Sequence, residues 1–270
     1  MSGFLRLPNR IKSGEFYMSK IKKIGVQLFT IRKFIKTKEE MANTFKRIKG
    51  MGYDELYING GGDEYKLIVD SAKNEGLELI GTTYNLKTIM ENTDDVLDNC
   101  RYSGSYSVGI YKEVTYSKEL YEKLCENINE TGKIISQSGA KLLYNHHARE
   151  FCKMEDGKRG MEMLKSLTNP QYLSFSLNTF WMQNAGVDIR HFISEFGGRI
   201  EILRMQDTDI AMDYLRGNAP VGSGNMYWDG IIEEAQKANV KHYIVEDEKF
   251  LGNLFDALEK SSDFIHKHYM

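Results

Sequence analysis

The feature that most constrains the fold is a repeated alternation of short apolar runs, rich in β-forming residues, with longer segments of helical periodicity. The predicted strands cover residues 24–29, 55–58, 77–81, 106–111, 140–145, 172–177, 199–205 and 241–245. The predicted helices cover residues 38–51, 63–74, 94–101, 118–137, 160–167, 189–195, 227–238 and 251–268. Glycine follows several of these helical segments, as is typical of helix C-terminal caps.

Parallel strands joined by right-handed helical crossovers explain this alternation. Eight strand–helix units in 270 residues match the size of a closed (β/α)8 TIM barrel in the α/β class. A doubly wound open sheet would normally carry a glycine fingerprint after its first strand, and Thr30-Ile31-Arg32 provides none. We therefore predict a single TIM-barrel domain over residues 18–270. Residues 1–17 are basic and lack the apolar core of a signal peptide. We expect them to be an N-terminal extension, either a disordered arm or a non-native segment.

Composition narrows the classes of partner. The formal net charge is -2, which gives no electrostatic reason to expect nucleic acid as a partner. No stretch is long and apolar enough to cross a bilayer, so we expect no membrane partner. Cys100, Cys125 and Cys152 are far apart in the sequence, which suits a reducing cytoplasm better than a disulfide framework. We expect a cytoplasmic protein that binds a small ligand, and association into homo-oligomers stays open.

Polar and ionisable residues follow four successive predicted strands. Barrels of this type place their sites at the C-terminal ends of the strands. The clusters at the ends of the fifth to eighth strands are 144–151, 178–181, 203–207 and 245–248. Surface loops are polar in any protein, and a lone histidine such as His146 or His147 is more often structural than catalytic. The concentration of these clusters at one end of a barrel nevertheless predicts a functional site there.

A family resemblance rests on motifs that occur in order along the chain. These are Gly25 to Arg32, Gly52-Tyr53-Asp54, Tyr144 to Phe151, Leu177-Asn178-Thr179-Phe180-Trp181, Gly198-Arg199-Ile200, Arg204-Met205-Gln206-Asp207, Val221-Gly222-Ser223-Gly224 and Val245-Glu246-Asp247. With them the chain resembles the xylose-isomerase-like TIM barrels known as sugar phosphate isomerases/epimerases, from the first strand to the last helix. The resemblance implies an isomerase or epimerase acting on a carbohydrate or a related polyol.

The resemblance also implies a divalent metal, Mn, Mg, Zn or Co, at the ends of strands five to eight. In the family the ligands are glutamate, aspartate, histidine and glutamate, and the metal polarises a carbonyl while the glutamates move a proton. The corresponding positions here are Glu150, Asn178, Arg204 and Glu246. Asn178 is a weaker ligand than aspartate, and Arg204 has only donors. We expect metal binding to be weak or absent, with Glu150, Glu246 and Asn178 as the remaining ligands.

A guanidinium between two carboxylates suggests a replacement for the metal charge. We hypothesise that Arg204 bridges Glu150 and Glu246, since a guanidinium can pair with both and relieve their repulsion. These three residues are the predicted catalytic group. The predicted substrate-binding residues are His147, Asn178, Trp181, Gln27 and Asp207. An aromatic face such as that of Trp181 packs well on the apolar side of a sugar ring.

Three functional classes remain open on the sequence. The first is an isomerase or epimerase that transfers a proton next to the carbonyl of a sugar or polyol ketone. The second is a catalytically inactive sugar-binding member of the family. The third is a scaffold without a ligand, which leaves the ionic mouth of the barrel unexplained. In addition, the backbone amides of Val221 to Gly224 could meet a phosphate, or form a plain turn.

Overall fold

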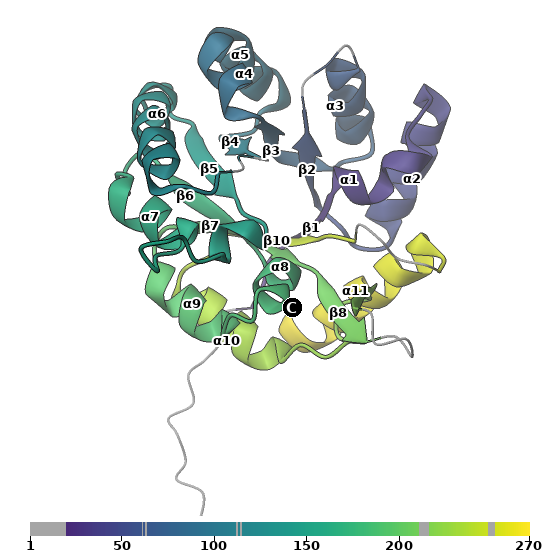
Figure 1. Ribbon diagram of the computed structural model, residues 1–270. Coiled ribbons are helices and arrows are strands. Elements are labelled where there is room, and N and C mark those ends of the chain that lie inside the picture. Colours follow the sequence, from purple (N-terminus) through teal and green to yellow (C-terminus); the bar gives the residue numbers. More distant parts are fainter. Residues whose placement is uncertain are drawn as a thin grey trace, which may run out of the picture.

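Eight parallel strands close into a barrel in the order β1-β10-β7-β6-β5-β4-β3-β2 in the computed structural model, and helices surround it (Figure 1). The structure describes residues 20–60, 62, 64–111, 113, 115–210, 216–247 and 252–270, so the predicted extension at residues 1–17 lies outside the described residues. The barrel strands are β1 (Ile24–Gln27), β2 (Glu55–Asn59), β3 (Glu78–Tyr84), β4 (Ser107–Ile110), β5 (Lys141–Asn145), β6 (Ser174–Asn178), β7 (Ile200–Met205) and β10 (His242–Val245). The predicted (β/α)8 barrel is confirmed.

The predicted helices form the outer ring, and short helices that the sequence did not indicate are added near the mouth. The outer helices are α2 (Lys38–Gly50), α3 (Tyr65–Asn74), α5 (Thr93–Ser103), α6 (Lys118–Gln137), α7 (Gly160–Leu167), α9 (Ile189–Phe196), α10 (Trp228–Lys237) and α11 (Leu254–Tyr269). The added elements are α1 (Leu28–Ile31), η1 (Arg32–Phe34), α4 (Leu86–Glu91), η2 (Arg149–Phe151) and α8 (Thr179–Asn184). None of the helices in the described ranges is long and apolar enough to cross a membrane.

The first predicted strand ends two residues early for a local reason. The side chain of Gln27 accepts a hydrogen bond from the backbone N–H of Leu28, and this cap begins α1 at a residue that the sequence assigns to a strand. The same device appears after β6, where the Asn178 side chain accepts from the N–H of Trp181 and begins α8. At both positions the cap residue ends a strand and begins a short helix at the mouth of the barrel.

The inside of the barrel is packed by a small apolar cluster of Tyr57, Ile80, Leu143, Ile202 and Ile244. Successive side chains on a strand point to opposite faces, so the residue two positions further along shares the inward direction. On this pattern, the next inward layer toward the mouth includes Asn145, Arg204 and Glu246. Polar residues at the strand ends therefore lie between this apolar cluster and the mouth of the barrel.

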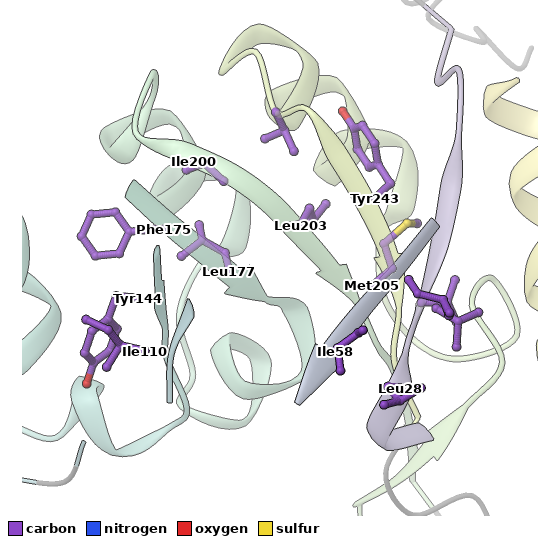
Figure 2. Close-up of a cluster of buried hydrophobic side chains, with 14 of the residues drawn as sticks. Leu28, Ile58, Ile110, Tyr144, Phe175, Leu177, Ile200, Leu203, Met205 and Tyr243 are labelled. Carbon is purple, nitrogen blue, oxygen red and sulfur yellow. The ribbon is translucent and has the colours of Figure 1, made fainter. Parts of the chain in front are cut away.

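The outward residues of the strands pack against the helices in a much larger core. Figure 2 draws part of this layer, to which Ile58 of β2, Tyr144 of β5 and Leu203 of β7 contribute. This continuous apolar layer between sheet and helices holds the strand ends in place, and with them the side chains at the mouth.

An antiparallel hairpin leaves the barrel after β7. It pairs β8 (Asp207–Ile210) with β9 (Arg216–Ala219), starting with Asp207 opposite Ala219. The hairpin lies between β7 and α10 in the sequence, where the sequence pattern predicts only a loop.

Candidate active site at the mouth of the barrel

A cavity of about 610 Å³ opens at the C-terminal ends of the strands. It is lined by Gln27, Phe29, Asn59, Thr83, Tyr111, Glu113, Asn145, His147, Ala148, Arg149, Glu150, Trp181, Arg204 and Glu246. The three predicted catalytic residues therefore line one cavity, together with Gln27, His147 and Trp181 from the predicted substrate-binding set. A cavity of this size suits a small-molecule ligand.

Arg204 is buried and forms a direct ion pair with Glu246. Its Nη1 lies 3.2 Å from Oε2 of Glu246, and its Nη2 donates to the backbone carbonyl of His146 at 3.0 Å. The third guanidinium nitrogen, Nε, is buried and has no hydrogen-bond partner among the described residues. Arg204 thus brings a positive charge and an unused donor to the cavity wall.

The expected bridge from Arg204 forms on one side only. Within the described residues, no ion pair or hydrogen bond joins Arg204 to Glu150. The reason is local, because the Glu150 carboxylate already accepts from the hydroxyl of Tyr144 at 3.1 Å and from the backbone N–H of His147 at 2.9 Å. The hypothesis of a guanidinium bridging both glutamates is corrected to a pair with Glu246.

Glu150 sits in an environment that disfavours its charged form. Burial raises the pKa of the Glu150 carboxyl above its ordinary range, although its hydrogen bonds and the charge of Arg204 act in the opposite direction. Glu246 differs because it accepts from a guanidinium. Two carboxylates in one cavity with such different partners are suited to different roles in proton transfer.

Asn178 orients the Glu246 carboxylate from the next strand. Its Nδ2 donates to Oε2 of Glu246 at 2.9 Å and to the side-chain oxygen of Gln206 at 2.8 Å. Its side-chain oxygen caps α8 through the N–H of Trp181. The side-chain amide of Asn178 is thereby held with its N–H groups toward Glu246. Asn178 does not line the cavity itself and acts on it through Glu246.

His147 and Trp181 form an aromatic corner of the cavity. Their ring centroids lie 5.5 Å apart, and within the described part of the chain the buried indole Nε1 of Trp181 has no hydrogen-bond partner. Burial, followed by the charges of Arg204 and Arg149, lowers the pKa of His147 to about 4. His147 is therefore neutral near pH 7 and can donate and accept hydrogen bonds to a hydroxylated ligand.

Tyr57 and Asn145 form a polar pair at the floor of the cavity that the sequence reasoning missed. The Tyr57 hydroxyl and the Asn145 side-chain amide lie within 3.2 Å, and burial raises the pKa of Tyr57. A side chain at Gly109 would collide with both groups, so glycine there makes room for the pair. The signal was present in the strand alternation, since Asn145 lies two residues after the inward Leu143.

Asp207, the one carboxylate among the predicted substrate-binding residues, forms its hydrogen bonds away from the cavity. It lies outside the cavity lining, because its oxygens accept hydrogen bonds from the N–H groups of Thr208, Gly222, Gly224 and Met226 and from the indole of Trp228. In the structure Asp207 thus holds the loop after β9, and a ligand contact at Asp207 stays a prediction.

The same contacts decide between the two interpretations of the glycine-rich loop, a phosphate site or a plain turn. The amides of Gly222 and Gly224 both point at Oδ2 of Asp207, at 2.9 and 3.2 Å. An internal carboxylate already takes the place that a phosphate would need. The structure therefore supports the reading of Val221 to Gly224 as a family turn.

The donor set does not fit the divalent metal that the resemblance implies. Among the described residues there is no group of three or more His, Cys, Asp and Glu side chains that could hold an ion. At the corresponding positions, Arg204 and the Nδ2 of Asn178 both present N–H donors to Glu246. A cation needs lone pairs from these positions and instead meets hydrogens.

Comparison with known proteins places the fold of this chain among related barrels. No protein-family model matches the sequence. Among curated proteins, the chain is similar to the inosose dehydratase of Mesomycoplasma hyopneumoniae, with 24% identity over 163 residues. The match covers 53% of this chain and 53% of that protein, so the chain spans about half the length of the curated relative it matches.

Solved structures match over nearly the whole chain. A sugar phosphate isomerase/epimerase from Parabacteroides distasonis superposes with a TM-score of 0.77 at 20% identity, covering 92% of this chain and 94% of that one. A xylose isomerase-like TIM barrel protein from Mycobacterium smegmatis, in complex with magnesium, has a TM-score of 0.65 at 10% identity and covers 91% and 95%. The fold of this chain is thus that of the xylose isomerase-like TIM barrels, as the sequence motifs indicated. The solved structures that share this fold include a sugar phosphate isomerase/epimerase.

Proposed function

We propose that the chain is an isomerase or epimerase that transfers a proton next to the carbonyl of a sugar or polyol ketone, using Arg204 where related barrels use a metal. The observation that carries the proposal is the unpartnered Nε of the buried Arg204, beside a cavity that also exposes Glu150 and Glu246. A buried donor without a partner is uncommon, and a ligand oxygen would satisfy it.

Arg204 has the chemistry to stabilise the charge that develops during proton abstraction. When a proton leaves the carbon next to a carbonyl, negative charge collects on the carbonyl oxygen as an enediolate forms. A fixed guanidinium in a site of low polarity stabilises that oxygen without reorganising in the reaction. Because Arg204 is already held by Glu246 and by a backbone carbonyl, it is preorganised for this role.

The two glutamates have complementary capacities for moving the proton. Among the described residues, both hydrogen bonds to the Glu246 carboxylate go to Oε2, so Oε1 is available to act as the base. Glu150, whose pKa is raised by burial, is suited to deliver a proton. One C–H bond breaks and one forms. Return of the proton to the former carbonyl carbon gives an isomer, and in this case the proton of the neighbouring hydroxyl moves to the former carbonyl oxygen as the new carbonyl forms. Return of the proton to the opposite face of the same carbon gives an epimer.

The remaining lining is suited to a hydroxylated, ring-shaped ligand. Trp181 offers an aromatic face with its indole N–H free, and Gln27, Asn59 and Thr83 add polar groups from strand ends. The names of the relatives, inosose dehydratase and sugar phosphate isomerase/epimerase, agree with a polyol carbonyl compound as the substrate class.

Deuterium exchange tests the proposal directly. The protein is incubated in D2O with a panel of ketoses and inososes, and NMR follows deuterium entering the carbon next to the carbonyl. We expect exchange with at least one compound and its loss in Glu246→Gln and Arg204→Gln. Arg101→Gln, at an exposed arginine on α5, is the matched control and keeps the rate. Clear binding without exchange would contradict the proposal and favour the inactive sugar-binding alternative.

A further inference from the structure

His146 is a fully buried histidine that the proposed chemistry does not use. It follows the last residue of β5, has no exposed surface and is absent from the cavity lining. Its ring packs edge-on against Phe151 with centroids 5.3 Å apart, yet both ring nitrogens make hydrogen bonds to the backbone. A buried polar ring with both nitrogens engaged has a defined orientation.

Proton counting fixes the form of this ring. Nε2 lies 2.9 Å from the backbone nitrogen of Asn178, which can only donate, so Nε2 must accept. Nδ1 lies 3.1 Å from the carbonyl oxygen of His147, which can only accept, so Nδ1 must carry the hydrogen. The neutral Nδ1–H tautomer is the one form that satisfies both contacts. Burial and the charge of Arg204, which lower the pKa of His146 to about 3, agree with it.

Beyond the last residue pair between β5 and β6, the His146 ring acts as a hydrogen-bond acceptor in place of a strand. The ladder between β5 and β6 ends with Asn145 opposite Ser176, two residues before Asn178. By accepting the N–H of Asn178, the ring satisfies a backbone group that no strand neighbour reaches. The position of the Asn178 backbone in turn determines how its amide reaches Glu246 and how α8 presents Trp181.

His146 also holds the second end of the Arg204 guanidinium. Its own carbonyl accepts from Nη2 of Arg204 at 3.0 Å, while Glu246 takes Nη1 on the other side. The bond from Nδ1–H to the carbonyl of His147 fixes the turn in which the accepting carbonyl of His146 lies. One residue thus links the ends of β5, β6 and β7.

We propose that His146 is a positioning residue, whose neutral Nδ1–H tautomer fixes Asn178 and Arg204 in the geometry that proton transfer needs. The expected effect of His146 on the exchange rate rests on the proposed function. Its expected effect on the positions of Asn178 and Arg204 rests on geometry alone.

Variants that copy one nitrogen at a time test the inference. In His146→Gln the side-chain oxygen can replace Nε2 as acceptor for Asn178, whereas His146→Asn replaces only Nδ1 and His146→Phe removes both bonds. His242→Gln, at a histidine on the opposite end of the barrel bonded to Glu55, is a control for loss of stability without a change at the mouth.

Two readouts are compared. The first is the deuterium exchange rate, which we expect to fall about tenfold or more in His146→Asn and His146→Phe, because an unpaired buried N–H misplaces Asn178. We expect His146→Gln to stay within about threefold of the parent protein. The second is the indole NMR signal of Trp181, which should shift in the same two variants while that of Trp228, bonded to Asp207, stays fixed.

The outcomes separate the two proposals. If the parent protein exchanges no proton, the proposed function fails and the Trp181 signal, together with the tautomer of His146 measured by nitrogen NMR at pH 7, decides the role of His146. A ring protonated on Nε2, an unmoved Trp181 signal in His146→Phe, or equal losses of exchange in His146→Asn and His242→Gln would overturn the inference. Retention in His146→Gln with loss in His146→Asn would support it.

Discussion

Arg204 and Glu246 form an ion pair of 3.2 Å in the barrel mouth, with side chains only 4% and 3% exposed. Burying two charges is expensive, and a well-packed apolar pair often stabilises a protein as much or more. The pair is therefore poorly explained by stability alone. Its place in the wall of a cavity, at two of the positions where the family resemblance implies metal ligands, suggests a chemical explanation.

Removing one partner of this pair should destabilise the protein strongly. Arg204→Met leaves Glu246 buried and unpaired, so we expect the free energy of unfolding in urea to fall by about 3 kcal/mol. The double variant Arg204→Met/Glu246→Leu should recover most of that loss, because no charge remains buried. Lys123→Met, which breaks an exposed pair with Glu126, serves as the control and should leave the unfolding midpoint unchanged. Equal effects of the two single substitutions would contradict the account.

Glu150→Gln should separate stability from activity. The pKa of Glu150 is raised in the fold, so stability is lost as the pH rises through that folded value. Glutamine keeps an acceptor for the N–H of His147 and removes the charge. We expect a higher unfolding midpoint than the parent at pH 8, no difference below the ordinary carboxyl pKa of about 4, and no proton exchange. Glu259→Gln, at an exposed position on α11, should change neither. A variant that keeps the parent exchange rate would remove Glu150 from the mechanism.

Acid should destabilise the fold through two histidines. The pKa of His146 is lowered to about 3 and that of His147 to about 4, both below the unfolded value of about 6.5. Between these limits the unfolded state binds more protons, so the free energy of unfolding decreases as the pH falls, by about 1.4 kcal/mol per unit for each histidine. Denaturation at pH 7, 6 and 5 measures the slope. The slope should drop in the double variant His146→Gln/His147→Gln and persist in His191→Gln, at an exposed histidine on α9. An unchanged slope in the double variant would refute this assignment.

Asp207 should matter for the loop and little for the ligand. Its carboxylate accepts four backbone N–H groups and the indole of Trp228, so Asp207→Asn turns an acceptor into a donor facing donors. We expect a loss of about 3 kcal/mol in unfolding free energy. At temperatures where the variant is folded, KM should stay within about threefold of the parent, because Asp207 does not line the cavity. Asp209→Asn, two residues further along β8 at an exposed position, is the comparison. A large rise in KM with unchanged stability would restore the original expectation of a ligand contact.

The sequence predicts the barrel well because its signals are local. Runs of apolar β-formers and helical periodicity locate every barrel strand, and α6 and α7 have the predicted bounds. The short helices α1 and α8 are missed because they begin at the caps Gln27 and Asn178, which lie at the ends of predicted strands. The hairpin of β8 and β9 is missed because its strands are four residues long and polar.

The site is predicted less completely because it depends on which partner each polar group finds. Strand ends place Glu150, Arg204 and Glu246 around one cavity, as motif order indicates. Sequence alone could not reveal that the Tyr144 hydroxyl and the His147 N–H donate to the Glu150 carboxylate, so that Arg204 pairs with Glu246 instead. Nor could it reveal that the amides of the glycine-rich loop, which resemble a phosphate site, are taken up by Asp207.

In the proposed function a guanidinium serves where the family resemblance implies a divalent cation. The most direct test is the deuterium exchange rate on a polyol ketone after exhaustive chelation, repeated with added Mn²⁺, Mg²⁺, Zn²⁺ or Co²⁺. The variant Asn178→Asp/Arg204→His, which restores the ligand types of the family, provides a matched comparison that should depend on added metal. The account predicts that the parent protein keeps its full rate in chelator and gains nothing from any cation. Loss of exchange on chelation and its recovery with one of these ions would contradict it.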